Sequence, residues 1–571
     1  KKVSNIDILS QEENTKITTL WNTTKVDFTN SKWPIYKFID EWVKKDPNAD
    51  AVLLSNGKIS RADLAKKANQ IAWWLIDMHL SKKPIGVCLN RSVNLVSSLL
   101  GIVKSGFAYL PIDPILPDDR IDYMITDSQV PVVITSTEYL GKFENTNAHI
   151  LNIDEFAWDL STASPVIDVS LDDLFYVIYT SGTSGKPKGV ILNHRGRVNN
   201  FLDFINRFNI DENDKLLSIS ALSFDMTAFD IFGVLAAGSA IVLPSKNEER
   251  NTEIWLDLIE KYNISIWHSA PALLKLLVEK LESSGDQIQL SMRLVLLGGD
   301  WIPLDLQERL SKFNKGMQYI SLGGATEVSM DSTIYEVEKS ESHWNSIPYG
   351  KPMANQRAYI IDEYGFPVPV GVSGELCLGG IGVGYGYLNQ PGLTADKFIP
   401  DPYWIPGARM YKTGDLARFN SDGTIELLGR IDFQIKIDGY RIETGEIESL
   451  IRKFSGIDTA VVSVYKEPNG KQKLVAYYTK SSESDIYNNE LRRYLADKLP
   501  YYMVPIYFLE LKQVPISPNG KVNRKGLSTL VVNKEEDKEI SMPPKTKNEF
   551  LLCNVWSEVL DCNVKEVNKS F

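Results

Sequence analysis

Short apolar runs alternate with segments of helical periodicity along most of the chain. The runs have the length of buried strands and occupy residues 51–54, 85–89, 132–135, 240–243, 264–267 and 294–297. Between them, apolar positions three and four residues apart predict helices, as over residues 35–42, 61–75 and 255–262. Because strands that alternate with helices form mostly parallel sheets, the pattern predicts an α/β architecture.

The pattern changes after about residue 430. Residues 460–465 and 473–478 are typical of strands and residues 490–498 of a helix, which together predict a small α+β domain. Residues 1–32 are polar apart from one amphipathic stretch, and a new amphipathic helix begins near residue 546. We therefore expect a lead-in linker, a large core, a small domain, a second linker and the start of a further domain, at residues 1–32, 33–431, 432–530, 531–544 and 545–571.

The charge balance excludes some functions and leaves phosphate binding open. The chain has 73 acidic and 62 basic residues, for a net charge of −11, so it lacks the basic surface expected of a protein that binds nucleic acid or membranes. The four cysteines form no CxxC pair, which disfavours a zinc site or disulfide framework and favours a cytoplasmic protein. We expect no signal peptide, and the apolar stretch 231–244 is too short for a membrane span. The chain has no initiator Met, as expected of a piece of a longer polypeptide.

A loop rich in glycine and hydroxyl side chains, YTSGTSGKPKG at residues 179–189, follows an apolar run that predicts a strand. Glycines allow backbone N–H groups to converge on an anion, and the hydroxyls and lysines add donors and positive charge. The spacing differs from that of a Walker A loop, and the alternative is a flexible surface hairpin. The candidate phosphate-binding residues are Thr180, Ser181, Gly182, Thr183, Ser184, Gly185, Lys186 and Lys188.

The loop is one of several segments in a characteristic order. The others are SGFAYLPID at 105–113, GATE at 324–327, YKTGD at 411–415, GRIDFQIK at 429–436, GYRIETGEIE at 439–448 and NGKVNR at 519–524. Together they resemble the adenylate-forming superfamily of acyl-CoA synthetases, luciferases and nonribosomal peptide synthetase adenylation domains, and they favour the last branch. The resemblance implies a large N-terminal core of two α/β sheets plus a β-barrel-like part near residues 350–430. A small, mobile α+β C-terminal lid would follow the core.

The resemblance also implies a reaction. A carboxylate joins the α-phosphate of ATP and expels pyrophosphate, and fixed positive groups and Mg²⁺ stabilise the charge that develops at phosphorus. Lys521 would be catalytic and bridge the carboxylate and the α-phosphate. Thr326 would contact the α-phosphate beside Gly324, and Glu327 would help to hold Mg²⁺, which prefers oxygen ligands. Outside these motifs, Glu327 would be interpreted as a solvated surface residue and Lys521 as an exposed turn lysine.

Further positions are assigned by the same resemblance. Asp415 would accept hydrogen bonds from the two ribose hydroxyls, because a carboxylate has two acceptor oxygens. Arg430 would reach the ribose or a phosphate, and Asp432 would be the hinge of the lid. Lys436 and Gly439 would belong to the loop that lines the path of a phosphopantetheine arm during thioester formation. Without the resemblance, Asp415 would be interpreted as a turn residue, Arg430 as part of a structural ion pair and Asp432 as an ordinary aspartate at a strand end.

The sequence departs from the family pattern near the nucleotide. Family members usually carry an aromatic residue, against the adenine face, where this chain has Gly323. Adenine stacking by that residue is therefore lost or taken over elsewhere. Leu427 also replaces a tyrosine found in some relatives, and Asp438 occupies a position that is often arginine.

The segment FDMTAFDIF at 224–232 resembles the opening of the amino-acid pocket. Asp225 would pair with the ammonium group of an α-amino acid, since a buried ammonium needs a charged partner; alone it would be a helix N-cap. His268 and Asp331 could bond a short polar side chain, which favours serine, with an ornithine-type substrate as the alternative and cysteine, alanine and glycine open. By resemblance the pocket positions are Asp225, Met226, Phe229, His268, Leu296, Gly298, Leu322, Met330, Asp331 and Lys521.

The expected partners follow from the same resemblance. Residues 545–571 resemble the start of a peptidyl carrier domain, so phosphopantetheine on a downstream carrier and neighbouring synthetase domains are expected, and a small activating partner protein is left open. The cofactors expected are ATP and Mg²⁺. Two rival functions remain, an acyl- or aryl-CoA ligase and a non-catalytic scaffold domain. Asp225 and the carrier-like tail disfavour the first, and Lys521, Glu327 and Asp415 disfavour the second.

Overall fold

The chain is described by a computed structural model. The structure describes residues 9–182, 186–284, 288–341, 344, 346–432, 434–467, 471–481, 486–515, 527, 552, 553 and 555. Two compact units divide at Glu443 and Thr444. The expected domain boundary at Asp432 stays a prediction.

A nine-stranded sheet forms one half of the core of the first unit. Its strand order is β15-β14-β13-β12-β11-β9-β10-β1-β2, and the strands from β13 to β1 are parallel. Strands such as β12 are apolar and fully buried, as expected where helices cover both faces. The strands are β15 (Lys351–Pro352), β14 (Thr333–Glu336), β13 (Gln318–Gly323), β12 (Leu294–Leu297), β11 (Ile266–Ser269), β9 (Lys215–Leu217), β10 (Ala240–Leu243), β1 (Asp50–Leu54) and β2 (Gly57–Ser60).

A seven-stranded sheet forms the other half, with the order β18-β8-β7-β4-β3-β5-β6. Its strands β7, β4, β3, β5 and β6 are parallel, whereas β8 pairs with β7 and β18 in antiparallel fashion. The expected α/β sheets are thus both present. The strands are β18 (Gly386–Tyr387), β8 (Lys188–Asn193), β7 (Leu174–Thr180), β4 (Tyr109–Pro111), β3 (Ile85–Cys88), β5 (Val132–Thr135) and β6 (His149–Asn152).

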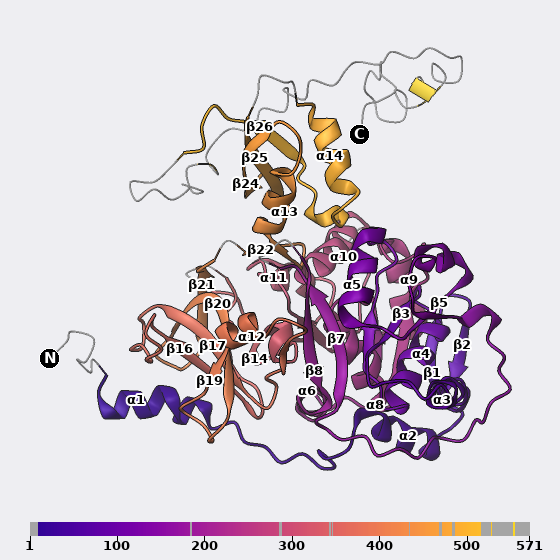
Figure 1. Ribbon diagram of the computed structural model, residues 1–571. Helices are drawn as coiled ribbons and strands as arrows, with labels where there is room; N and C mark the ends of the chain where they lie inside the picture. The colour runs from indigo at the N-terminus through magenta and orange to yellow at the C-terminus, as the bar shows by residue number, and fades with distance from the viewer. Residues whose placement is uncertain are drawn as a thin grey trace. The chain divides into compact units, whose positions relative to one another are not determined.

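Helices of the first unit surround these sheets (Figure 1). Several begin at side-chain caps: Ser60, Ser92 and Asn193 accept hydrogen bonds from backbone N–H groups of the first turn. The α-helices are α1 (Gln11–Thr18), α2 (Ile35–Lys45), α3 (Arg61–Asp77), α4 (Val93–Lys104), α5 (Asp118–Ser128), α6 (His194–Arg207), α7 (Met226–Ala228), α8 (Val234–Ala236), α9 (Thr252–Tyr262), α10 (Pro271–Ser284), α11 (Leu306–Ser311) and α12 (Pro391–Lys397). The 3₁₀-helices are η2 (Leu20–Asn22), η3 (Thr137–Phe143), η4 (Ile153–Glu155) and η6 (Thr326–Val328), and η5 (Phe229–Gly233) is a π-helix.

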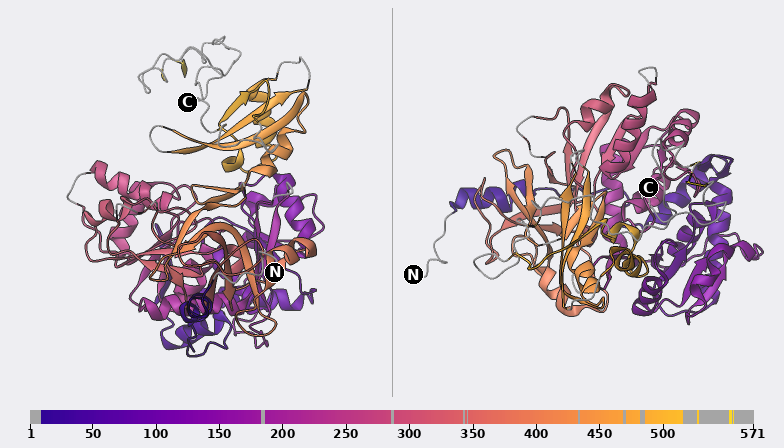
Figure 2. Two further views of the ribbon diagram at one scale, coloured as in Figure 1. Left: turned by 90° about the vertical axis from the view of Figure 1, so that its left-hand side faces the viewer. Right: turned by 90° about the horizontal axis from the view of Figure 1, so that it is seen from above.

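The part expected to be barrel-like is a five-stranded antiparallel sheet. β16 (Gln356–Ile361), β17 (Gly374–Gly380) and β20 (Arg409–Phe419) follow in order, and both β19 (Phe398–Pro400) and β21 (Ile425–Arg430) pair with β20. The helix α1 and the turn after it pack on this sheet, as Figures 1 and 2 show. The Asn22 amide donates to the Ala358 carbonyl at 3.0 Å, and the Trp21 ring lies 5.0 Å from that of Phe419. The lead-in segment is therefore a packed helix over these residues.

The short hairpin β22 (Gln434–Ile437) and β23 (Tyr440–Glu443) completes the first unit. The second unit has a three-stranded sheet in which β24 (Ile457–Lys466) and β26 (Tyr507–Glu510) flank β25 (Gln472–Lys480). The helices α13 (Thr444–Ile451) and α14 (Asn488–Ala496) and the 3₁₀-helix η7 (Tyr501–Met503) accompany it. This is the α+β composition that the sequence predicts. Of the described helices, none combines the length and the apolar character that a membrane span requires.

Candidate active site

The predicted phosphate loop joins β7 and β8. Thr180 at the end of β7 pairs with Lys188 at the start of β8. Gly182 has no room for a side chain, because a Cβ atom there would collide with the carbonyl oxygen of Lys186. The Thr180 hydroxyl is buried and has no hydrogen-bond partner within the described part of the chain. Such an atom at a tight turn can serve an anionic ligand. The predicted residues Thr183, Ser184 and Gly185 lie outside the described residues.

Glu327 lies at the centre of a buried ion cluster. It belongs to η6 and is fully buried. Arg441 Nη1 lies 3.1 and 2.9 Å from its two oxygens, Lys188 Nζ lies 3.6 Å from Oε1, and the Tyr387 hydroxyl donates to Oε1 at 2.8 Å. Burial alone would raise the pKa of Glu327, but Arg441 and Lys188 lower it below its usual range. Burial also lowers the pKa of Lys188 to about 8, and the charge of Arg441 acts in the same direction.

This arrangement does not fit a Mg²⁺ ion at Glu327. Mg²⁺ needs carboxylate oxygens free for octahedral coordination, whereas Arg441 engages both oxygens and two cationic groups surround them. Nowhere in the described ranges do three or more His, Cys, Asp or Glu side chains form a group that could hold a metal. These contacts therefore lend no support to the prediction that Glu327 helps to hold Mg²⁺. The contact between Arg441 and Glu327 was not predicted from the sequence.

Arg430 connects two of the predicted nucleotide and hinge residues. Arg430 on β21 is the register partner of Asp415 on β20, and its Nη1 donates to Asp415 Oδ1 at 2.8 Å. Its Nε and Nη2 donate to the two oxygens of Asp432 at 2.9 and 2.7 Å. Burial would raise the pKa of Asp432, but Arg430 lowers it below its ordinary value. The Arg430 guanidinium thus joins Asp415, predicted to bind the ribose, and Asp432, the predicted hinge, in one ion network.

The predicted thioester-state residues lie on the hairpin β22–β23. Lys436 is on β22, and Gly439 follows at the turn with a φ of +84°. The Gly439 N–H donates to Asp300 Oδ2 at 2.9 Å. A Cβ atom at Gly439 would lie 2.8 Å from the Cβ of Ala270. Both the positive φ and this close approach therefore require glycine.

The described residues predicted to line the amino-acid pocket meet at the carboxyl ends of β11, β12 and β13. His268 on β11 is the register partner of Leu296 on β12. A Cβ atom at Gly298 would lie 3.5 Å from Asp331 Oδ1 and 3.4 Å from Leu322 Cβ. The Phe229 ring, on the π-helix, lies edge-on to His268 with centroids 5.6 Å apart. Met226, Leu322 and Met330 are also buried. The structure thus brings together segments that are far apart in the sequence.

Two polar atoms in this pocket have no described partner. His268 Nδ1 lies 2.7 Å from Asp230 Oδ1, and both side chains are fully buried. Because a carboxylate only accepts, Nδ1 carries the proton of this bond, and Nε2 can accept a hydrogen bond when it carries no proton. Among the residues described, neither His268 Nε2 nor Asp331 Oδ2 has a hydrogen-bond partner. Burial raises the pKa of Asp331 to about 7, with Asp225 adding to the shift and His268 and Arg197 opposing it.

Asp225 lies beside Thr326, the residue predicted to contact the α-phosphate. A hydrogen bond from Thr326 lowers the pKa of Asp225, as does the charge of Arg197, but burial dominates and the net shift is upward. The carboxyl group is thus close to both the pocket and η6. An amino acid whose ammonium group reached Asp225 would present its carboxylate near Thr326.

A clamp that the sequence did not reveal supports the pocket wall. Ser329 and Met330 both have left-handed φ angles, of 64° and 73°, which are costly for side chains with a Cβ. From α6, the fully buried Arg197 donates to the Ser329 carbonyl at 2.6 Å. Asn200 donates to the carbonyls of Ser329 and Asp331 at 2.6 and 2.7 Å. These bonds hold the strained turn that presents Asp331. The sequence signal that could have indicated these contacts is the set of polar residues on the buried face of α6.

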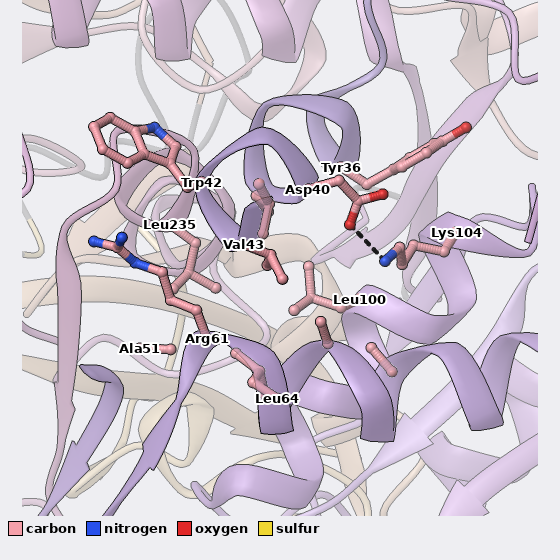
Figure 3. A pocket seen from close by; sticks show the side chains of 13 residues that line it. Tyr36, Asp40, Trp42, Val43, Ala51, Arg61, Leu64, Leu100, Lys104 and Leu235 are labelled. Carbon is pink, nitrogen blue, oxygen red and sulfur yellow. Dashed lines mark hydrogen bonds and ion pairs between the residues drawn. The ribbon is translucent and has the colours of Figure 1, made fainter. Parts of the chain in front are cut away.

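A cavity lies between α2, α3 and α4, away from these residues (Figure 3). It has about 20 Å³ of space, enough for roughly one water molecule. Lys104 and Asp40 form an ion pair of 2.6 Å on its wall. None of the predicted site residues lines it, so it is best explained as a packing void with a structural ion pair.

Comparison with known proteins decides the family. Residues 39–388, more than half of the chain, match the family described as AMP-binding enzyme. The chain belongs to the AMP-binding enzyme family. The predictions that the chain is an enzyme and that it resembles nonribosomal peptide synthetase adenylation domains are confirmed.

Relatives of this AMP-binding enzyme are larger synthetases. It is 36% identical over 575 residues to gramicidin S synthase 2 of Aneurinibacillus migulanus, covering 100% of this chain and 13% of that protein. It is 36% identical over 530 residues to tyrocidine synthase 1 of Brevibacillus parabrevis, covering 92% of this chain and 48% of that protein. The chain thus spans less than half the length of these relatives.

Solved structures support the same assignment and confirm the fold class. The nonribosomal peptide synthetase FmoA3 bound to α-methyl-L-serine-AMP matches with a TM-score of 0.70 and 31% identity, over 91% of this chain and 52% of that chain. A four-domain nonribosomal peptide synthetase bound to AMP and glycine matches with a TM-score of 0.67 and 28% identity, over 100% of this chain and 41% of that one.

Lys521 lies outside the described residues, as does the predicted carrier start apart from Leu552, Cys553 and Val555. Of the predicted phosphate loop, Lys186 is exposed and Ser181 donates to the Arg441 carbonyl at 2.7 Å.

Proposed function

We propose that this AMP-binding enzyme activates an α-amino acid with ATP and transfers it to a carrier domain. An oxygen of the substrate carboxylate attacks the α-phosphorus, the bond to the β-phosphate breaks, and pyrophosphate leaves. A phosphopantetheine thiolate then attacks the carbonyl carbon of the aminoacyl-AMP, and AMP leaves as the thioester forms. The observation that carries this proposal is the convergence of Asp225, His268 and Asp331 on one buried pocket beside Thr326.

The proposed residue roles are those that the family resemblance implies, and the charges of the described residues support them. Asp225 pairs with the substrate ammonium, which needs a charged partner when it is removed from water. The loop after Thr180 and the lysine Lys188 receive phosphate oxygens, and Asp415 accepts hydrogen bonds from the ribose. Lys521 supplies positive charge between the carboxylate and the α-phosphate in the transition state. Mg²⁺ enters this proposal only as the counter-ion of the ATP substrate.

Serine is the substrate that we propose. In its neutral form His268 would offer an acceptor at Nε2, and Asp331 can carry a proton at neutral pH because its pKa is about 7. A single hydroxyl group can donate to His268 Nε2 and accept from protonated Asp331, so that both buried atoms are satisfied. Support also comes from FmoA3, whose bound ligand contains α-methyl-L-serine.

An ornithine-type side chain is the second candidate. Its ammonium would donate to both His268 Nε2 and an ionised Asp331, so the two unpartnered atoms also favour it. Cysteine, alanine and glycine leave at least one of these buried groups without a strong partner. The two candidates differ in charge, and the pH dependence of binding distinguishes them.

Amino-acid-dependent exchange between ATP and radiolabelled pyrophosphate tests the proposed reaction. The panel contains the proteinogenic amino acids, ornithine, hydroxyornithine, aryl acids and fatty acids. Exchange with one amino acid supports the proposal and names the substrate. Exchange with aryl or fatty acids only would replace it with a CoA ligase. An absence of exchange, together with no ATP binding in calorimetry, would indicate a scaffold domain.

The catalytic role of Lys521 has its own test. Lys521→Ala should reduce the exchange rate by about 100-fold or more, because a charge that stabilises the transition state is removed. Lys512→Ala, at an exposed lysine, is the matched control and should retain the wild-type rate. Near wild-type exchange by Lys521→Ala would reject the assigned role.

The partner in the second step is the phosphopantetheinylated carrier domain, together with the neighbouring synthetase domains. Transfer of radiolabelled amino acid to a separately supplied carrier should depend on ATP and on the phosphopantetheine arm. Exchange that depends on an added small protein would establish the activating partner that the sequence left open.

A further inference from the structure

The space beside Gly323 is filled by a tyrosine from another segment. Gly323 ends β13 and is buried. A Cβ atom at this position would lie 2.5 Å from Tyr349 Cζ and would also collide with Thr333 Oγ1. No side chain fits at residue 323 while Tyr349 keeps its place. Tyr349 therefore occupies the volume that a side chain at residue 323 would otherwise fill.

Tyr349 is held in this place from both ends. Its hydroxyl donates to the Gly324 carbonyl at 2.9 Å, and its backbone N–H donates to the Ile425 carbonyl at 2.8 Å. The next residue, Gly350, forms a β-bridge with Ile425. The ring is thus fixed before any ligand binds, which lowers the entropic cost of recognition.

Tyr349 also lies within electrostatic range of Asp415, the residue predicted to bind the ribose. Burial raises the pKa of Tyr349, and the Asp415 carboxylate is close enough to raise it further. Tyr349 as a residue is half-buried and packs against the edge of the core. In a nucleotide the base is attached directly to the ribose, so a base whose ribose reached Asp415 would lie near this ring.

We propose that Tyr349 supplies the aromatic face for the adenine base of ATP in this enzyme, and that residue 323 is glycine to make room for it. This inference rests on the proposed function, since it requires that ATP binds with its ribose at Asp415. Tyr349 acts as a binding residue that positions the nucleotide. The π-face of a base stacks on an aromatic ring whatever the direction from which the ring is supplied.

Calorimetric titration with ATP and with inorganic tripolyphosphate tests this inference, because only ATP carries a base. Tyr349→Leu should weaken ATP binding by about 10- to 100-fold, the usual effect of losing a stacked base. Tripolyphosphate binding should stay at the wild-type level, which also shows that the variant is folded. Tyr349→Phe keeps the ring and loses the bond to Gly324, so it should bind ATP more tightly than Tyr349→Leu. Tyr364→Leu, at an exposed tyrosine, should match the wild type.

A second variant displaces the Tyr349 ring without changing the tyrosine itself. Gly323→Ala introduces the Cβ atom that collides with Tyr349, so it should also weaken ATP binding while the KM for the amino acid changes little. Equal affinity for ATP in wild type and Tyr349→Leu would overturn the inference. So would a parallel loss of ATP and tripolyphosphate binding. If the wild-type protein itself bound no ATP, the proposed function would fail, and this inference with it.

Discussion

Replacing Asp331 with asparagine tests the charge state of the amino-acid pocket. Burial raises the pKa of this carboxyl group from 3.8 to about 7 in the folded protein. Well below pH 3.8 it is protonated in both states and contributes no pH dependence. Between about pH 4 and 7 the unfolded chain loses the proton while the folded chain retains it, so the wild type loses stability as the pH rises. The shift of about three units corresponds to roughly 4 kcal/mol above pH 7.

Urea unfolding of wild type and Asp331→Asn at pH 5, 6, 7 and 8 measures this difference directly. The asparagine variant does not titrate, so its stability relative to the wild type should grow with pH and level off above pH 7. Asp305→Asn, at an exposed aspartate, is the matched control and should show no such growth. A constant difference between Asp331→Asn and wild type from pH 5 to 8 would refute the reasoning.

Two further predictions concern buried pairs of polar side chains. His268→Phe keeps a ring in the core but leaves Asp230 buried without its partner, so urea unfolding should show a loss of about 3–5 kcal/mol; adding Asp230→Leu should restore most of it, and a persistent loss would assign the effect to packing. Arg441→Ala removes the cation that contacts both oxygens of Glu327, so the variant should be less stable than the wild type at pH 8, with a difference that shrinks as the pH falls below 4.5. Unfolding curves at pH 4 and 8 check this, and a gap independent of pH would count against the ion pair.

The strands and the main helices could be predicted because their signal is local. The apolar runs at residues 85–89, 132–135 and 294–297 became β3, β5 and β12 with small changes at their ends. The periodicity at residues 61–75 became α3, which extends to Asp77. Hydrophobic spacing reports which face of an element is buried, and that information is carried by neighbouring residues.

The polar contacts of the site could not be predicted, because they join residues that are distant in sequence. Arg441 and Glu327 lie on separate segments, and nothing in the local pattern at either position indicates the other. The same holds for Tyr349 beside Gly323, where the sequence indicates a missing aromatic residue but not its replacement. The π-helix at Phe229–Gly233 likewise has no compositional signature.

Gly298 makes the depth of the amino-acid pocket adjustable in small steps. A methyl group at this position would meet Leu322 and Asp331 at 3.4 and 3.5 Å, which are ordinary van der Waals distances. The backbone and the strands around it therefore need not move to accept alanine. The residues that carry the pocket, on the ends of β11, β12 and β13, stay as they are. Under the proposed function, substrate size can thus change by single carbon atoms while the surrounding strands keep their positions.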